Sequence, residues 1–512
     1  MTKKIFLASE IVSGKESPND RSVTLCFGHF NAIHPGHIRY FRSASKYGGD
    51  LVVAVEGDLQ LVSGALGQMF SQDDRAQAVA ALDMVDRVVI LDNEPLQRLI
   101  QKLRPSTFAL GREFERESPL QIASAIEEVE KQGGKVVYDA GETLYFSASA
   151  LHSRPVDNER ERWKAFSIVQ AAEQLELGKI LEAISTESPP NILVIGDTIV
   201  DRYIACDALG MSNEAPVVVV KEIEQEKYLG GAAIVSAHIS ALGAKSTYIS
   251  VFGEDELSSY VRTELDRHGV NARLFEDNTR PTTFKTRYLV GSQKLFRVSR
   301  LKEHSITSEI EEEIITLLEE RAPHLDAILV SDFVYGVITK RIVEVLQILS
   351  KRYHLQLFGD IQCSSQIGSV TKFHEFDLLC PTEREARIAL ANHNDGVEYV
   401  ATSLLEATKA KNLILKLGED GFIAYDGRAR GVIPHRQYFP ALTVSPIDVT
   451  GAGDSLIAAM AVGLAQGLSV MEASCLACCV AAVAVQTVGN QPVGLDDVHQ
   501  LIENRIRHGY EI

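Results

Sequence analysis

Residues 448–455 read Asp-Val-Thr-Gly-Ala-Gly-Asp-Ser, and the small-residue run LIAAMAVGLAQG follows at 456–467. Glycine and alanine at 451–453 let several backbone N–H groups approach one anion, and a helix that begins there adds its positive N-terminal end. Asp454 stands in the same turn, where a carboxylate can take a proton from a substrate hydroxyl. The pattern indicates a phosphoryl-transfer site, although an aspartate that merely caps a buried helix looks the same in isolation.

The segments around this motif alternate between strand-like and helix-like patterns. The apolar runs are NILVIGD (191–197), STYISVFG (246–253), AILVSDF (327–333), LQLFGD (355–360) and LILKLG (413–418). Alternation of this kind predicts an α/β domain with a parallel sheet covered by helices. We assign it to residues 191–512.

A second alternating region precedes it. Its apolar runs are VTLCF (23–27), DLVVAVEGD (50–58) and RVVILD (87–92). We therefore expect another α/β domain at 22–154, after an N-terminal extension at 1–21. Residues 155–190 contain the single Trp163, are rich in charged residues and alanine, and end at Pro189-Pro190. We expect a helical linker there.

Composition narrows the possible functions. The chain has 512 residues, 45% of them hydrophobic, and a net charge of -18. Such a charge disfavours nucleic-acid and anionic-membrane partners, but leaves room for a local phosphate pocket. No apolar run is long enough to span a bilayer, and the N-terminus is a poor secretory signal, so we expect a cytoplasmic protein. Cys475, Cys478 and Cys479 lie in an apolar helical pattern and are expected to be buried rather than metal-binding.

The C-terminal region resembles the ribokinase-like (PfkB-type) carbohydrate kinases over residues 191–500. Within that family, SNEAPVVVV, RPTTFKTRYL and QKLFRV resemble the heptose kinase of ADP-heptose synthesis. The resemblance implies a small β lid over the sugar, which we place at 212–228 and 280–300. The implied residues are Asp454 as the catalytic base; Gly451, Ala452 and Gly453 as the anion hole; Asp201, Gly230 and Gly231 for the sugar; Lys416, Gly418 and Gly421 for the nucleotide; and Glu385 for indirect contact with Mg²⁺.

The N-terminal region carries Phe27-Gly-His-Phe-Asn-Ala-Ile-His34-Pro-Gly-His37 directly after its first apolar run. Histidines three apart at the start of a helix can both face a phosphate and stabilise the charge of nucleotidyl transfer. A metal site would need a third ligand, and no candidate ligand stands at a spacing that is typical of metal sites. Core-packing histidines are the remaining alternative, which the glycines and proline around them do not favour.

This region resembles the Rossmann-like cytidylyltransferase family with its His-x-Gly-His signature, over about residues 22–154. The resemblance implies His34 and His37 as catalytic residues. It implies nucleotide contacts from Phe27, Gly28, Lys46, Asp58, Arg75, Ser147 and Ser149, although the two serines alone would read as helix caps.

Both regions depart from their families. In the kinase region Ile234 replaces an asparagine, and Tyr335 and the stretch Asp360-Ile-Gln362 lack the family's lysines. In the transferase region Asn31 replaces an aspartate, Leu110 replaces a lysine, and residues 57–71 contain no Lys or Arg. The phosphoryl-transfer parts are therefore expected to be intact, and the sugar and nucleotide phosphates to be held differently.

Together the regions resemble the bifunctional heptose kinase/adenylyltransferases with the domain order swapped. The implied reaction first phosphorylates a sugar or sugar phosphate with ATP and Mg²⁺, heptose 7-phosphate being one candidate. The sugar 1-phosphate then attacks a nucleoside triphosphate to give an NDP-sugar. The resemblance implies a homodimer, and it leaves open whether a monovalent cation is bound as well. The alternatives are a sugar, polyol or nucleoside kinase whose N-terminal domain is non-catalytic or regulatory; a purely structural role is the least favoured.

Overall fold

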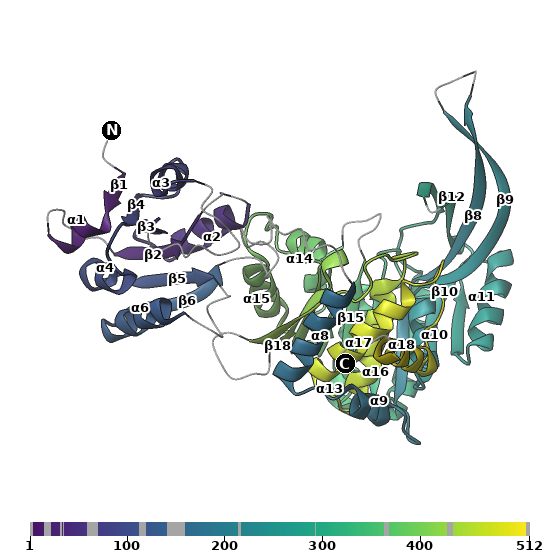
Figure 1. The fold of residues 1–512 in the computed structure, drawn as a ribbon. Helices are drawn as coiled ribbons and strands as arrows, with labels where there is room; N and C mark the ends of the chain where they lie inside the picture. The colour runs from purple at the N-terminus through teal and green to yellow at the C-terminus, as the bar shows by residue number, and fades with distance from the viewer. Residues whose placement is uncertain are drawn as a thin grey trace. The chain divides into compact units, whose positions relative to one another are not determined.

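The computed structural model describes residues 4–14, 22–30, 33, 35–58, 70–111, 119–140, 159–212, 214, 217–291, 293–362, 368–427 and 434–507. The chain divides into two compact units, Met1–Val156 with Asn392–Val400, and Asp157–Ala391 with Ala401–Ile512. Both are α/β, as the alternating patterns predict (Figure 1). None of the described helices combines the length and the apolar character that a membrane span needs.

The first unit contains a six-stranded parallel sheet in the order β1-β4-β3-β2-β5-β6. The strands are β1 (Ile5–Leu7), β2 (Val23–Gly28), β3 (Asp50–Glu56), β4 (Arg87–Leu91), β5 (Thr107–Gly111) and β6 (Lys135–Ala140). The N-terminal extension thus supplies an edge strand, since β1 pairs with β4. The chain runs outward from β2 through β4 and then crosses to β5 on the other side of β2. Ligands of such sheets bind at the carboxyl ends of the strands where the order reverses, here between β2 and β5.

Helices cover both faces of this sheet. They are α1 (Ala8–Val12), α2 (Pro35–Ser45), α3 (Gln72–Ala80), α4 (Leu96–Leu103) and α6 (Leu120–Lys131). Leu25 and Phe27 of β2 pack in one apolar core with α1, α4 and α6, whereas Cys26 between them packs in a second core with α2 and α3. Because successive side chains of a strand point to opposite faces, a strand buried on both sides needs an unbroken apolar run, as VTLCF is.

The second unit contains a nine-stranded sheet in the order β11-β10-β7-β14-β15-β16-β17-β18-β19, parallel as far as β17 and antiparallel beyond it. The strands are β7 (Asn191–Gly196), β10 (Lys245–Phe252), β11 (Asn271–Glu276), β14 (Ala327–Asp332), β15 (Gln356–Ile361), β16 (Leu378–Leu379), β17 (Asn412–Lys416), β18 (Phe422–Asp426) and β19 (His435–Phe439). The strand order reverses between β7 and β14, which marks the carboxyl ends of these strands as the expected binding edge.

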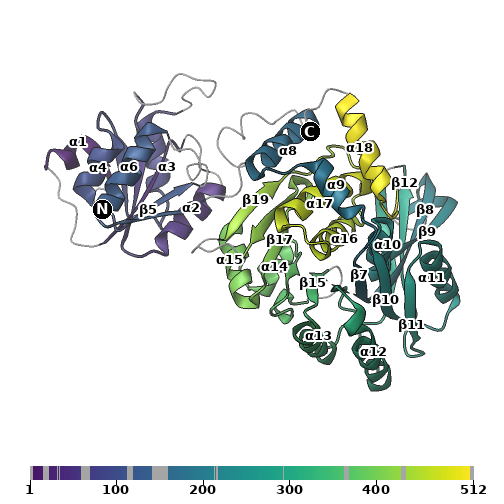
Figure 2. The same cartoon turned by 90° about the horizontal axis from the view of Figure 1, so that it is seen from below.

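Figure 2 shows α16 and α17 on one face of this sheet and α12 and α13 on the other. The helices are α8 (Glu159–Glu173), α9 (Leu177–Ile184), α10 (Ala232–Ala241), α11 (Glu256–Arg267), α12 (Ser308–Arg321), α13 (Lys340–Tyr353), α14 (Glu383–Ala389), α15 (Val397–Thr408), α16 (Ala452–Ala465), α17 (Val470–Ala484) and α18 (Leu495–Arg507). The linker region is helical as expected, but Trp163 of α8 and Ile180 of α9 are buried in the core of the second unit. Cys475, Cys478 and Cys479 are buried on α17, as predicted.

A separate four-stranded sheet, β13-β12-β8-β9, forms the lid. Its strands are β8 (Thr198–Met211), β9 (Val218–Gly231), β12 (Thr283–Val290) and β13 (Gln293–Arg300). Figure 1 shows β8 and β9 as a long hairpin that leaves the main sheet. The lid was expected at 212–228 and 280–300, so β9, β12 and β13 lie largely where predicted, whereas β8 was missed. Its register puts Asp201 of β8 between Tyr228 of β9 and Lys285 of β12.

Candidate active site

Polar side chains gather at the carboxyl edge of the nine-stranded sheet. Asp197 follows β7 directly, Asp332 ends β14, Asp360 lies near the end of β15, and Lys416 ends β17. The four strands that position these side chains are apolar along most of their length. Parallel strands bring their carboxyl ends to one edge, which is why residues far apart in sequence meet there.

Asp454 stands at the start of α16, above this edge. Gly451 caps the helix with a φ of 83°, and a Cβ there would lie 2.2 Å from Oδ1 of Asn490, so the turn needs glycine. Asp454 is 5% exposed. Burial raises the pKa of Asp454 to about 7, and the charge of Asp360 adds to the rise, while Lys416 and Gln362 oppose it. A carboxylate with such a pKa is suited to general base catalysis near neutral pH.

Lys416 lies against the glycine turn rather than on an exposed loop. Its Nζ donates to Oδ1 of Asp360 over 2.8 Å, and a Cβ on Gly453 would lie 3.4 Å from that Nζ. Burial would lower the pKa of Lys416, but the charges of Asp360 and Glu385 raise it above its usual value. The lysine therefore carries a positive charge beside the glycine turn. Gly418 and Gly421 bound the turn from β17 to β18, and both have positive φ.

The sugar-side residues predicted from sequence come together at the base of the lid. Asp201 is buried and forms an ion pair with Arg287. A Cβ on Gly230 would lie 2.5 Å from Oδ2 of Asp201, and a Cβ on Gly231 would lie 2.5 Å from the carbonyl oxygen of Asp197. The charge of Asp201 also contributes to the raised pKa of Asp454. Asp201, the two glycines and Asp454 therefore belong to one site.

Three cations on the lid were missed by the sequence prediction. Lys285 and Arg287 pair in register with Asp201 and Tyr203, so all four point to the same face of the lid. Lys294 donates to Oδ1 of Asp448 over 2.7 Å and to Oγ1 of Thr450 over 2.8 Å. Burial would raise the pKa of Asp448, but Lys294 and neighbouring donors lower it to about 2. The two-residue spacing of Lys285 and Arg287 in a strand-like stretch was the signal that could have revealed the first two.

Lys285 is unusual among these cations. It is 4% exposed, and its Nζ lies 5.2 Å from the ring centre of Phe333 and 5.4 Å from that of Tyr335. Among the described residues it has no acidic partner. A buried ammonium without a counter-ion is unfavourable unless a ligand supplies the negative charge.

Glu385 holds the start of its own helix. Its carboxylate accepts from the backbone N–H of Thr382 over 2.8 Å, and its own N–H donates to Oγ1 of Thr382 over 3.2 Å. This capping box lies beside Lys416, where the charge of Glu385 contributes to the raised pKa of that lysine. Within the described ranges, no group of three or more His, Cys, Asp or Glu is placed to hold a metal ion directly.

In the first unit, Phe27 and Gly28 end β2 at the point where the strand order reverses. The backbone N–H of Phe27 donates to Oη of Tyr40 over 3.1 Å, and that hydroxyl donates to the carbonyl of Ala109 over 2.6 Å, which ties β2 to β5. His37 lies in the first turn of α2, with its ring 5.0 Å from that of Phe30. His34, Ser147 and Ser149 lie outside the described residues, as does Asn31.

Arg75 and Asp58 contact each other at the same edge of that sheet. Nη2 of Arg75 donates to Oδ1 of Asp58 over 2.7 Å, and Nη1 and Nε donate to the carbonyls of His29 and Phe70. The Arg75 side chain is 0% exposed, so in this structure it braces the loops around the site. Lys46 follows the last residue of α2, nine positions after His37, which at 1.5 Å per residue puts it roughly 13 Å along the helix axis from that histidine.

Comparison with known proteins identifies the larger unit. Residues 189–497 match the pfkB family carbohydrate kinase model. The chain belongs to the pfkB family of carbohydrate kinases. Residues 25–149 match the cytidylyltransferase-like model, so a cytidylyltransferase-like domain precedes the kinase. The family predictions made from the two motifs are thereby confirmed.

Individual relatives agree with this assignment. The chain is similar to "Bifunctional protein HldE" of Campylobacter jejuni subsp. doylei, with 32% identity over 324 residues, 62% of this chain and 66% of the relative. It is also similar to the protein of that name from Geotalea uraniireducens, with 32% identity over 310 residues, 60% and 61%. The similar region thus spans just under two thirds of these relatives. The kinase fold is that of phosphofructokinase-2 from Escherichia coli, with a TM-score of 0.51, 15% identity, and coverage of 62% of this chain and 99% of that one.

Proposed function

We propose that this chain activates a sugar in two steps, phosphorylation by the kinase domain and nucleotidyl transfer by the N-terminal domain, to give an NDP-sugar. The first step rests on Asp454, whose raised pKa and place beside the glycine turn suit a base for the attacking hydroxyl. Asp201, Gly230 and Gly231 orient the sugar. The amides of residues 451–453, with the Lys416 ammonium beside them, stabilise the transferred phosphoryl group of ATP.

Mg²⁺ is part of this proposal. It would neutralise the ATP phosphates, and Asp360 and Glu385 offer the carboxylate oxygens it prefers. Asp360 already binds Lys416, and Glu385 already holds its helix start, so both fit contact through water better than direct coordination. A monovalent cation fits less well at the neighbouring carboxylate, Asp448, because Lys294 and Tyr203 already bind its oxygens.

We propose that the substrate is a sugar phosphate, with heptose 7-phosphate as the leading candidate. The observation that supports a charged sugar is Lys285, a buried ammonium on the same face as Asp201. Arg287 adds a second cation on that face. These lid cations can bind a phosphate group in place of the lysines that are absent at Tyr335 and Gln362. The absence of those two lysines is therefore compatible with a phosphorylated substrate.

The second step is proposed for the N-terminal domain. The sugar 1-phosphate attacks the α-phosphorus of a nucleoside triphosphate, His34 and His37 stabilise the charge, and pyrophosphate leaves. The cytidylyltransferase-like match, the place of His37 in the first turn of α2 and the name "bifunctional" in the relatives support this step. Ser147 and Ser149 are proposed to hold the triphosphate.

One observation favours a regulatory N-terminal domain instead. Arg75, expected to contact the nucleotide, is fully buried against Asp58, which leaves fewer cations for a triphosphate. If that domain binds a nucleotide without reacting, the chain is a sugar, polyol or nucleoside kinase.

A homodimer formed through the lid is also proposed. Large apolar side chains are exposed on its strands and the adjoining turn: Leu209, Met211, Val217, Val218, Val219, Ile223, Leu295, Phe296 and Val298. Exposed apolar side chains that gather on one sheet mark an association surface. Sedimentation of the protein and of a Phe296→Ser variant tests this, and a wild-type monomer would contradict it.

The function is tested by incubating the protein with Mg²⁺, ATP and a panel of sugars and sugar phosphates that includes heptose 7-phosphate, while ADP and pyrophosphate are followed separately. Release of both products supports the two-step reaction. ADP alone, lost in Asp454→Asn, supports the kinase with a regulatory domain. Absence of ADP with every sugar would refute sugar phosphorylation and direct the search to nucleosides and polyols.

A further inference from the structure

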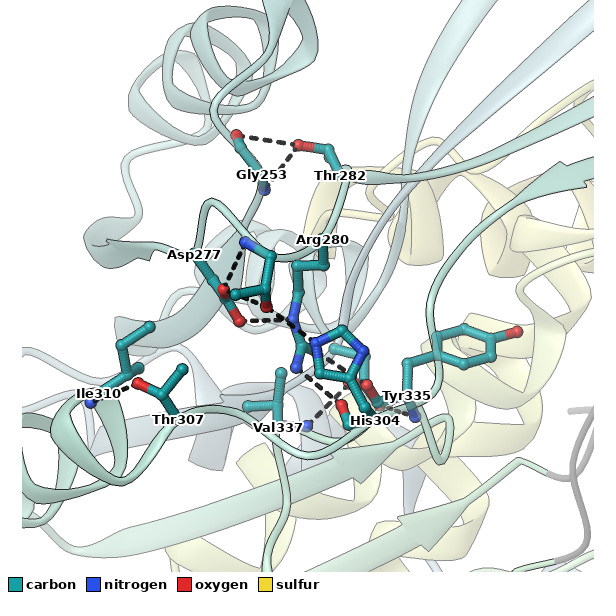
Figure 3. Close-up of polar contacts among 11 residues, drawn as sticks. Gly253, Asp277, Arg280, Thr282, His304, Thr307, Ile310, Tyr335 and Val337 are labelled. Atoms are coloured by element: carbon teal, nitrogen blue, oxygen red, sulfur yellow. Dashed lines mark hydrogen bonds and ion pairs between the residues drawn. The ribbon is translucent and has the colours of Figure 1, made fainter.

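Arg280 is buried just before lid strand β12, and all of its nitrogens are bonded. Nε donates to Oδ2 of Asp277 over 2.8 Å, Nη1 to the carbonyl of Tyr335 over 2.9 Å, and Nη2 to the carbonyl of His304 over 2.7 Å. Figure 3 shows the guanidinium reaching these partners from one point. The planar fork of arginine can hold several acceptors in fixed directions, which lysine cannot do.

The partners of Arg280 lie on different segments that border the sugar site. Arg280 precedes β12, which begins at Thr283, and His304 follows β13, which ends at Arg300. The two ends of the β12–β13 hairpin are therefore joined through one side chain. Thr282 fixes the same point further, because its Oγ1 accepts from the backbone N–H of Gly253 over 3.1 Å.

The third partner, Tyr335, belongs to the loop 333–337 after β14. The backbone N–H groups of Phe333, Tyr335 and Val337 all donate to the carboxylate of Asp197, at 2.8, 3.3 and 3.4 Å. Val334 has a φ of 63°, which a β-branched residue rarely adopts, so surrounding contacts must hold the loop in place.

This loop also presents its aromatic rings to the lid. Phe333 and Tyr335 lie against Lys285 of β12. Moving the loop relative to β12 would therefore change the surroundings of Lys285 and of its register neighbour, Asp201.

We infer that Arg280 is a positioning residue for sugar binding, which fixes the β12–β13 hairpin of the lid against the loop 333–337. The inference builds on the proposed kinase reaction. Arg280 does not touch Asp454 or the glycine turn in any described contact, so its effect should fall on the sugar and not on ATP or on the chemical step.

The first test is Arg280→Lys, which keeps the charge opposite Asp277 but cannot reach both carbonyls. With heptose 7-phosphate as the probe, we expect KM for the sugar to rise about tenfold or more, while KM for ATP and kcat change by less than about twofold. Arg352→Lys is the control, since Arg352 is an exposed arginine of α13 that lies over the ring of Tyr353 and should be neutral. A lower kcat with unchanged sugar KM would mean that Arg280 only stabilises the fold.

The second test does not depend on turnover. Hydrogen–deuterium exchange of the full chain without substrate should be faster in Arg280→Lys at residues 283–290, 293–300 and 333–337, and unchanged in α16. Asp277→Asn should give a smaller effect in the same segments. Unchanged exchange there would overturn the inference. If wild type phosphorylates no sugar but exchange changes as expected, the proposed function fails while the anchoring role of Arg280 stands.

Discussion

Nε2 of Gln362 donates a hydrogen bond to Oδ1 of Asp454 over 2.6 Å and also contacts Oδ2 of Asp360 at 3.3 Å. The glutamine thus stands between the proposed base and the carboxylate paired with Lys416. By donating to the ionised form, it lowers the pKa of Asp454 against the effect of burial. A neutral amide donor therefore contacts both carboxylates.

This contact predicts the pH dependence of the kinase. The base must be deprotonated to act, so kcat for ADP release should rise with pH through about 7. Gln362→Met removes the donor, raises the pKa of Asp454 and should move the rising limb to higher pH. The exposed Gln500→Met serves as control. An unshifted profile in Gln362→Met would show that another group controls the limb.

The same raised pKa predicts a trade between stability and activity in Asp454→Asn. Between about pH 4 and pH 7, Asp454 is ionised in the unfolded chain but still protonated in the folded protein. The free energy of unfolding therefore falls as pH rises through this range, and the full loss is reached above about pH 7. The variant should therefore gain more in Tm over wild type at pH 8 than at pH 5. Its kcat should fall by at least about 100-fold. The exposed Asp266→Asn should change neither, and equal Tm gains at both pH values would contradict the assignment.

Gly451→Ala should abolish phosphoryl transfer. Its φ of 83° strains any residue other than glycine, and a methyl group would lie 2.2 Å from Oδ1 of Asn490, so that side chain or the start of α16 must move. Gly467→Ala, at another positive φ but with nothing within 4 Å, is the matched control for backbone strain alone. ADP release and Tm should be measured for both. Equal losses would mean that backbone strain, and not the geometry of the proposed anion hole, is responsible.

Lys285→Met should discriminate between charged and neutral sugars. Loss of a charge-assisted contact worth about 1.5–3 kcal/mol predicts a rise in KM of about 10- to 100-fold for a sugar phosphate, and little change for the same sugar without its phosphate. Lys302→Met, at an exposed position beyond β13, is the control. An equal effect on both sugars would point to a packing role for Lys285.

Arg75→Met should affect only the transferase reaction. The substitution leaves Asp58 without its arginine and the carbonyls of His29 and Phe70 without their donor. We expect pyrophosphate release to fall at least about tenfold, with ADP release unchanged, because the two units fold around separate cores. Loss of ADP release as well would show that the kinase depends on the N-terminal unit.

The sequence by itself determined the two α/β domains and the motif at 448–455 that is typical of carbohydrate kinases. Unbroken apolar runs such as VTLCF and NILVIGD identify buried strands, because a strand that is covered on both faces needs apolar side chains at nearly every position. The motif at 448–455 predicts its own local geometry, because its glycines and the start of the helix that follows are adjacent in sequence. The close approach of Asp201 and Gly230 also follows from one hairpin, that of β8 and β9.

Only the tertiary structure decided which distant charges meet. Asp360 beside Lys416, Lys294 on Asp448, and Arg280 between His304 and Tyr335 join segments that no local pattern relates. The burial of Arg75 against Asp58 likewise depends on loop packing that the motif does not encode. Burial then sets the pKa of Asp454, because desolvation is a property of the assembled core and not of the residue or its neighbours in sequence.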